Sequence, residues 1–178
     1  MNVLLTSQNS YLKLCLVFRK YILVSGMKDP VQLKEKLVKH IKEITDRRLL
    51  EIDTALVQAQ ESANDDTKSS AGDKYETSRE MIQQDINRLQ KQRAEVIREL
   101  DIINKIEQEG TEVGKLGALV VTDRFTYFVA TSLGQLVIDG NKYAVVSAQS
   151  PIGKQLIGKE KGQDFEFNGI RQTIKGIY

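Results

Sequence analysis

Asp73 and Glu76 are the two residues of this chain whose type and spacing are best suited to chemistry. They lie in the stretch Ser69-Ser-Ala-Gly-Asp-Lys-Tyr-Glu-Thr77, where two long amphipathic helices are expected to turn back on each other. A pair of acids at the far end of a stalk is poorly suited to binding a small substrate alone, but it can deliver charge into the cavity of another macromolecule. The pair therefore indicates a function performed together with a larger partner.

The same two residues also fit a purely structural role at the start of the second helix. Asp73 would accept hydrogen bonds from the free N–H groups of the first turn, and Glu76 at the third position would complete a capping box. Residues three apart share one face of a helix, so the two carboxylates can also converge on a single ion. Capping and ion binding can coexist, and both readings stay open here.

Two helical segments must position these acids. From Val31 to about Ala63, apolar residues recur at helical spacing, and from Ile82 they follow alternating steps of four and three, as in a coiled coil. The predicted seam consists of Leu33, Leu37, Ile41, Ile44, Ile52 and Leu56 in the first segment and Ile82, Ile86, Leu89, Val96, Leu100 and Ile103 in the second. Arg93 fills the one polar slot, where a register-setting or snorkelling role is favoured over binding. We expect residues 27–110 to form an antiparallel hairpin about 45 Å long with an acidic tip.

The pattern changes after Gly110. Residues 111–117 hold two glycines and predict a linker, and the apolar period then switches from 3.6 to 2. Residues 118–178 predict short strands at Ala118–Thr122, Thr126–Thr131, Gln135–Ile138, Tyr143–Ala148, Asp164–Phe167 and Ile170–Ile177. Turns are expected at 139–142 and at Asn168-Gly169, with a two-turn helix from Ser150-Pro151 to Gly158. The predicted class is α+β: a long antiparallel helical hairpin and then a small antiparallel sheet domain with one short helix.

Composition excludes several classes of function. The chain has 178 residues with 26 Lys and Arg against 24 Asp and Glu, so its net charge of +2 offers no general attraction to nucleic acid. The single Cys15 excludes an internal disulfide framework and the single His40 excludes a histidine metal cluster. A reducing, cytoplasmic setting and an inert Cys15 are therefore expected.

The first 26 residues form an N-terminal extension of a different composition. The apolar run Tyr11–Val24 is interrupted by Lys13, Arg19 and Lys20, so it fits neither a membrane span nor a secretory signal. The composition changes at Met27-Lys-Asp-Pro30, where Asp29 is a suitable helix cap and Pro30 a suitable first helical residue. We expect Met27 to be the natural start.

After Met27 the chain resembles the bacterial transcript-cleavage factors, the Gre family. The run Ser150-Pro-Ile-Gly-Lys-Gln-Leu-Ile-Gly-Lys-Glu-Lys-Gly162 is similar to that family's Ser-Pro-Ile and Leu-Ile-Gly-Lys pattern. Gly72-Asp-Lys-Tyr-Glu76 keeps the Gly-Asp-x-x-Glu spacing found at the tip of the family's coiled coil. The short match gains weight from its position between the two helices.

The resemblance implies an elongation factor that is not an enzyme by itself. Such a factor docks an FKBP-like C-terminal domain on RNA polymerase, inserts its coiled coil into the secondary channel and stimulates the polymerase's cleavage of backtracked RNA. It implies that Asp73 and Glu76 share the polymerase's Mg²⁺ rather than hold a metal or cofactor of the factor's own, and that the chain acts as a monomer away from membranes. Two carboxylates alone would bind Mg²⁺ weakly, because this ion gives up its waters reluctantly. Candidate contacts to the RNA 3′ end are Lys68, Lys74, Tyr75 and Arg79, and candidate docking residues are Ser150, Pro151, Ile152 and Lys159.

The chain departs from the family around the tip. Lys74-Tyr75 replace the usual Leu-Ser pair, and Thr77-Ser-Arg-Glu80 replaces the usual Asn-Ala-Glu-Tyr stretch. A polymerase-binding regulator without cleavage activity is therefore one alternative. The other is a peptidyl-prolyl isomerase-like domain on a coiled-coil dimerisation arm, which would need an aromatic-lined pocket. Asp65 and Asp66 are open to two readings as well, as extra metal ligands or as loop-solubilising residues.

Overall fold

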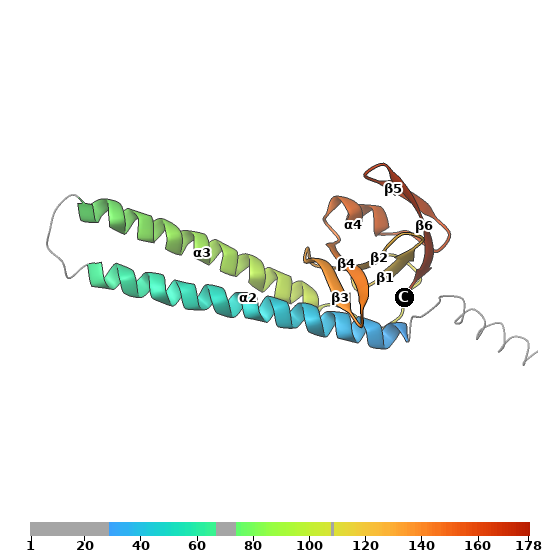
Figure 1. Cartoon of the computed structure of the whole chain (residues 1–178), viewed down its shortest axis with the longest axis horizontal. Helices are drawn as coiled ribbons and strands as arrows, with labels where there is room; N and C mark the ends of the chain where they lie inside the picture. The colour runs from blue at the N-terminus through green and yellow to red at the C-terminus, as the bar shows by residue number, and fades with distance from the viewer. Residues whose placement is uncertain (1–28, 67–73, 108) are drawn as a thin grey trace, which may run out of the picture.

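The structure is a computed structural model that describes residues 29–66, 74–107 and 109–178. Helix α2 (Pro30–Asp66) and helix α3 (Lys74–Asn104) form an antiparallel hairpin, which we call the stalk. Residues 118–178, which we call the sheet body, form a six-stranded sheet with the short helix α4 (Pro151–Leu156). Figure 1 shows the sheet body over one end of the stalk while the other end projects away from it. The predicted α+β class is confirmed.

Helix α2 begins at the cap that the sequence predicts. The Asp29 carboxylate accepts a hydrogen bond from the Val31 amide at 3.1 Å, and Pro30 takes the first helical position, where no N–H is needed. The predicted seam lies between the helices. Its buried members are Leu33, Leu37, Ile41, Leu56, Ile86, Val96 and Ile103, and its half-buried members are Ile44, Ile52, Ile82, Leu89 and Leu100.

Two polar pairs join the helices across the seam. Arg93 donates from Nε to the Asp53 carboxylate at 2.6 Å, and Arg48 donates to Glu99 at 3.0 Å. Both pairs cross from α3 to α2 with nearly the same stagger, as an antiparallel hairpin requires. The predicted register-setting role of Arg93 is thus matched by a partner on the opposite helix.

The strands follow the predicted ranges within two residues. They are β1 (Leu119–Thr122), β2 (Thr126–Ala130), β3 (Gly134–Ile138), β4 (Asn141–Ser147), β5 (Asp164–Phe167) and β6 (Ile170–Ile177), in the sheet order β3-β4-β2-β1-β6-β5. The turns at Asp139-Gly140 and Asn168-Gly169 have positive φ at both residues, which is the geometry that joins a two-residue hairpin. Both predicted hairpins are confirmed.

One detail of the predicted sheet is wrong: it is mixed rather than antiparallel throughout. Strand β2 pairs in parallel with β4, with Phe128 opposite Val145, while the other pairings are antiparallel. After β2 the chain reverses direction and forms β3, which does not pair with β2. Strand β4 then lies between them, antiparallel to β3 and parallel to β2. Strand length and turn chemistry are local, whereas this choice of neighbour is made by the packing of the whole sheet.

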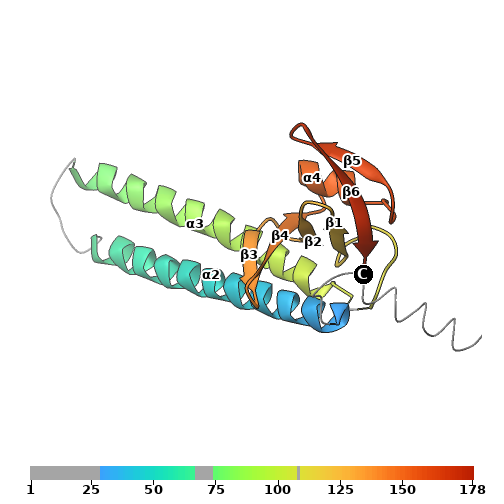
Figure 2. The same ribbon diagram turned by 45° about the vertical axis from the view of Figure 1, so that its right-hand side comes forward.

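The two faces of the sheet are covered by different elements. One face packs on the base of the stalk in a core of Leu33, Leu37, Ile41, Ile103, Ile106, Leu119, Phe128, Ala130, Leu136, Tyr143 and Val145. The opposite face packs under α4 and β5 in a core of Ala118, Val120, Tyr127, Val129, Ile152, Leu156, Phe165, Ile174 and Ile177. Figure 2, in the turned view, shows the sheet between the base of α2 and helix α4. The stalk and the sheet body are therefore joined by a shared apolar core as well as by the chain.

Helix α3 ends at Asn104, before the predicted end of the hairpin at residue 110. The amides of Lys105 and Ile106 bond to the carbonyls three residues back, on Ile102 and Ile103, which tightens the last turn. This turn brings Ile106 into the shared core, where it is 9% exposed. The chain therefore leaves the helix just where Ile106 enters the shared core.

Candidate functional site

The predicted acidic tip lies at the end of the stalk remote from the sheet body. Helix α2 ends at Asp66 and helix α3 begins at Lys74 at this end, as Figure 1 shows. Asp73 and Lys68 lie outside the described residues. Glu76, Lys74 and Tyr75 belong to α3 by their backbone, but their side chains, like those of Asp65 and Asp66, lie outside the description.

The start of α3 is consistent with both readings of the acidic pair. Because the helix begins at Lys74, Asp73 takes the cap position in the sequence and Glu76 the third helical position. A carboxylate at either position also interacts favourably with the positive end of the helix dipole. The metal-ligand roles of Asp73 and Glu76 stay predictions.

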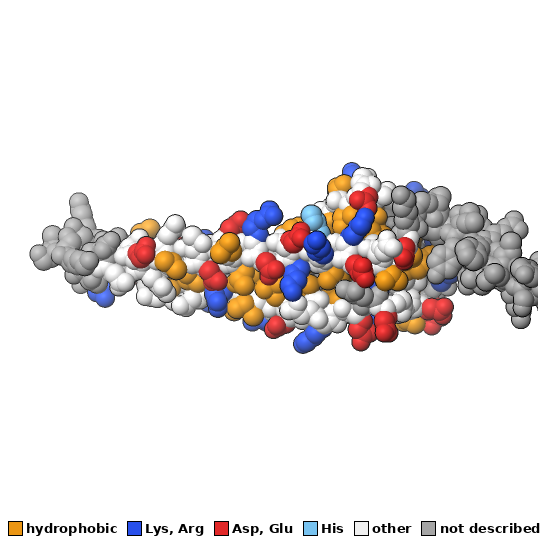
Figure 3. Space-filling view, turned by 90° about the horizontal axis from the view of Figure 1, so that it is seen from below, with side chains coloured by type: hydrophobic (Ala, Val, Ile, Leu, Met, Phe, Trp, Pro, Cys, Tyr) orange, Lys and Arg blue, Asp and Glu red, His pale blue; other side chains and the backbone are white. Residues whose placement is uncertain are grey.

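The outer half of the stalk is acidic. Residues 49–98 carry ten Asp and Glu against seven Lys and Arg, a net charge of −3, although the whole chain carries +2. Arg79 is exposed on α3, one turn beyond Glu76. Figure 3 shows that charged side chains of both signs alternate with apolar ones along the underside of the stalk. The excess of carboxylates favours a cation near the tip and opposes close approach of a phosphate backbone, except beside Lys68, Lys74 and Arg79.

The four predicted docking residues have different surroundings in the structure. Ser150 caps α4: its hydroxyl accepts from the Gly153 amide at 3.1 Å and donates to the Ser147 carbonyl at 2.6 Å. Ile152 is 8% exposed within the core beneath α4. Pro151 is exposed at the first turn of the helix, and the half-buried Lys159 donates to the Asp164 carbonyl at 3.3 Å. The structure thus gives Ser150 and Ile152 folding roles, and Pro151 presents the most accessible surface of the four.

The segment after α4 holds the predicted linker in place. The Gly114 amide donates to the Lys159 carbonyl and the Gly158 amide donates to the Gly114 carbonyl, both at 2.8 Å. A Cβ at Gly114 would lie 1.9 Å from the carbonyl oxygen of Leu156, so only glycine permits this approach. The Leu-Ile-Gly-Lys motif therefore clamps the chain that joins the stalk to the sheet body. The sequence predicts both segments, but nothing in it predicts that they pair.

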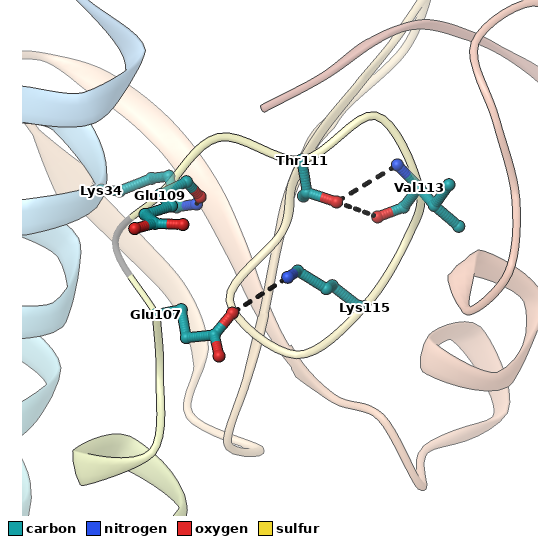
Figure 4. A network of polar contacts seen from close by, with 6 residues as sticks. All are labelled: Lys34, Glu107, Glu109, Thr111, Val113 and Lys115. Atoms are coloured by element: carbon teal, nitrogen blue, oxygen red, sulfur yellow. Dashed lines mark hydrogen bonds and ion pairs between the residues drawn. The ribbon is translucent and has the colours of Figure 1, made fainter.

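Lys34 is a buried charged residue that is not among the candidate site residues predicted from the sequence. It is 1% exposed, and its ammonium donates to the main-chain carbonyl of Glu109 at 2.7 Å (Figure 4). Close by, Lys115 pairs with Glu107 at 3.0 Å, and both of these side chains are largely exposed. Lys34 is one of six Lys and Arg in residues 29–48, and its place four residues before Val38 and seven before Ile41, on the apolar face of the helix, is the signal that could have distinguished it.

The environment of Lys34 lowers its pKa. Burial is the main cause, because it penalises the charged form, and the nearby cation of Lys115 lowers the pKa further. The Glu107 carboxylate acts in the opposite direction. Desolvation and the nearby Lys115 cation therefore both disfavour the charged form of Lys34 at this position.

The described residues show no other arrangement that would hold a metal ion. No group of three or more His, Cys, Asp or Glu side chains within the described ranges is placed to do so. Among the described helices, none has the length and apolar character needed to cross a membrane.

Comparison with known proteins gives weak similarities only. No protein-family model matches the chain, and no curated protein matches it. Among solved structures, the chain is similar to the transcription factor Gfh1, with 20% identity and a TM-score of 0.31 over 77% of this chain and 92% of that one. It is also similar to a second structure, of GreA factor homolog 1 (Gfh1) of Thermus thermophilus, with 20% identity and a TM-score of 0.32 over 77% and 94% of the two chains. Neither likeness assigns a role to a residue of this chain.

Proposed function

We propose that this chain is an RNA polymerase-binding elongation factor that inserts its stalk into the polymerase's secondary channel and stimulates cleavage of backtracked RNA. The observation that supports this most is that Glu76 of the Gly72-Asp-x-x-Glu76 motif belongs to the first turn of α3, at the end of the stalk remote from the sheet body. A rod with an acidic end can reach a centre that the sheet body itself cannot enter. The sheet body then docks outside, through the surface around Pro151 and Lys159.

Asp73 and Glu76 are the residues proposed to act on the reacting centre. Carboxylate oxygens are the ligands that Mg²⁺ prefers, so the donor set fits the ion, and two donors are too few to hold it without the polymerase's own ligands. When bound, the shared Mg²⁺ supplies stabilisation of charge on the entering and leaving oxygens of the displacement. Asp73 is proposed as the main ligand, and Glu76 as the second ligand or the residue that orients the attacking water.

The three cations nearest the tip are proposed to contact the RNA. Lys68, Lys74 and Arg79 are the only Lys and Arg in residues 49–87, so they offer the phosphates local attraction in an otherwise acidic region. Tyr75 is proposed to stack on an exposed base. These contacts would position the RNA 3′ end without reading its sequence.

Cleavage of a stalled elongation complex from the same organism tests the proposal. The decisive variant is Asp73→Asn, because Asn removes the charge but caps a helix as well as Asp does. We expect Asp73→Asn to lower stimulated cleavage by about 100-fold or more, since a metal ligand contributes several kcal/mol and each 1.4 kcal/mol is tenfold in rate. Helix content, melting temperature and polymerase binding should stay at the wild-type level. Full cleavage by Asp73→Asn would overturn the assignment and leave Asp73 as a cap.

The regulator without cleavage activity is the second candidate, favoured by the altered residues Lys74-Tyr75 and Thr77–Glu80. It predicts that the wild-type protein binds polymerase and changes pausing or initiation without releasing 3′-end RNA fragments. In that case Asp73→Asn would leave transcription unchanged. The same assay therefore separates the two candidates.

The isomerase alternative is disfavoured by the use of the aromatic residues in the cores. Phe128 and Tyr143 are buried against the stalk, and Tyr127 and Phe165 are buried beneath α4, which leaves few rings to line a proline pocket. A proline-isomerisation assay on a model peptide, with light scattering to measure association, tests this alternative directly.

A further inference from the structure

A buried lysine joins the stalk to the segment that leads into the sheet body. Lys34 lies in the second turn of α2, between the core residues Leu33 and Leu37, and donates to the carbonyl of Glu109 at 2.7 Å. Glu109 follows the end of α3, so the contact spans 75 residues of sequence. It fastens the base of the first stalk helix to the chain just after the second one ends.

The contact with Glu109 is the first of two that restrain this segment. Five residues further on, Gly114 is held between Lys159 and Gly158 by two backbone hydrogen bonds of 2.8 Å. Between them, the Thr111 hydroxyl bonds to both the amide and the carbonyl of Val113, which shapes the turn (Figure 4). The connecting segment is thus fixed to the stalk at one end and to the sheet body at the other.

Thermodynamic stability does not explain a lysine at this position. A buried ammonium loses its hydration, and here a second cation, that of Lys115, lies close enough to oppose it. An apolar side chain of similar length, such as methionine, would fill the same space without that cost. What lysine adds to the close-packed contacts of the shared core is a directional hydrogen bond from the stalk to the connecting segment.

Small rotations at the base of the stalk have large effects at its tip. Asp66, the last residue of α2, comes 32 positions after Lys34, so at about 1.5 Å per residue the outer end of the helix lies roughly 48 Å away. A rotation of about 5° at the base would then move the outer end by roughly 4 Å, while a displacement of about 1 Å can already cost two orders of magnitude in rate. The angle between stalk and sheet body must therefore be held within a few degrees.

We propose that Lys34 is a positioning residue that fixes the angle between the stalk and the sheet body through its hydrogen bond to the Glu109 carbonyl. The consequence for cleavage rests on the proposed function, because the position of the tip matters only if the tip acts at a partner's centre. The effect of Lys34 on the angle between stalk and sheet body does not depend on the proposed function, and it can be measured on the protein without a partner.

Distance measurement between two spin labels tests the angle. One label is placed at Gln60, exposed on the outer part of α2, and the other at Gln135, exposed on β3, in a full-length chain that carries Cys15→Ser. We expect Lys34→Met to broaden the distance distribution about twofold or more, while its unfolding midpoint is unchanged or higher. The matched control is Lys115→Met, which removes the same charge from the exposed neighbour and should leave the distribution narrow. Lys34→Arg, which keeps a cationic donor, should restore most of the sharpness.

The outcomes separate this proposal from the proposed function. A wild-type distance distribution in Lys34→Met overturns the positioning role, whatever the cleavage assay shows. If Lys34→Met does not fold, Lys34→Gln takes its place, since its shorter side chain cannot reach the Glu109 carbonyl, and the same criterion applies. In the cleavage assay Lys34→Met should be slower by about tenfold or more. Asp73→Asn should lose cleavage with an unchanged distance distribution, so failure of either idea is recognised independently.

Discussion

The base and the outer half of the stalk are the same two helices in different surroundings. At the base, Leu37 and Ile41 are fully buried, because the sheet body covers the side of the stalk that a lone hairpin would leave exposed. In the outer half the helices have only each other: Leu56, Ile86 and Val96 are buried in the seam, but Ile52 and Leu89 are half-buried and Leu50 is 68% exposed. The base therefore has a three-element core, and the outer half has the narrow seam of a two-stranded coiled coil.

Charge follows the same division. The outer half carries the net negative charge, and its Arg93–Asp53 pair is partly exposed to solvent. The base has a charged group, Lys34, that is shut away from solvent. The two ends of the stalk therefore differ in what surrounds them: the base is held by a shared apolar core and contains a buried ammonium, whereas the charged side chains of the outer half are exposed or partly exposed.

The largest expected difference between the two regions is in the cost of losing a seam side chain. Leu37→Ala should lower the free energy of unfolding by about 2–5 kcal/mol, because it leaves a cavity in the shared core. Leu89→Ala, at a half-buried position, should cost on the order of 1 kcal/mol. Urea unfolding of both variants measures this, and equal costs would contradict the view that the base is the anchored end.

The clamp on the connecting segment gives the next effect. Gly114→Ala should destabilise the protein by about 1–3 kcal/mol, since its Cβ would meet the Leu156 carbonyl oxygen at 1.9 Å and force the backbone apart. Gly110→Ala is the matched control, because no atom lies within 4 Å of a Cβ there, and it should change stability by less than about 1 kcal/mol. Similar melting temperatures for the two variants would show that the Gly114 contact is dispensable.

A smaller effect is expected for the interhelical ion pair. A double-mutant cycle on Arg93→Gln and Asp53→Asn should give a coupling energy of about 0.2–1 kcal/mol, because both side chains are partly exposed. The control is Arg88–Asp85, an exposed pair within α3 that cannot affect register. If the spin-label distance from Gln60 to a site on α3 is unchanged in Arg93→Gln, the pair does not set the register.

The smallest effect is a pH dependence from Lys34. Its pKa in the folded protein is lowered from 10.5, so between that lowered value and about 10.5 the unfolded chain binds more protons than the folded one. The free energy of unfolding of the wild type should therefore rise with pH in this window relative to Lys34→Met. Tyr127 and Tyr143, whose pKa values burial raises, titrate in both proteins and cancel in the difference. A difference that is flat or falls with pH would show that Lys34 is not desolvated in solution.

Much of the architecture could be predicted because its signals are local. The steps of four and three from Ile82 to Ile103 predict the seam. Asn168-Gly169 predicts a two-residue hairpin turn, and both residues have the positive φ that this turn requires. Ser150-Pro151 predicts the start of α4 by the same logic, and the structure supplies the hydrogen bond from Gly153 that confirms it. For the tip, the sequence predicts residues and roles, and the side chains of Asp73 and Glu76 lie outside what the structure describes.

The two stalk helices and the hairpin turns follow from the amino-acid sequence alone, because periodicity and turn chemistry act over a few residues. The roles of Asp73 and Glu76 stay predictions from that sequence. Only the tertiary structure decided the parallel pairing of β2 with β4, the burial of Lys34 and the clamp of Gly114 by Gly158 and Lys159. Each of these joins segments far apart in the chain, and their energies depend on which surfaces meet rather than on neighbouring residues. The helical period places Lys34 on the same face as Val38 and Ile41, and only the covering segment shows that its charge is buried.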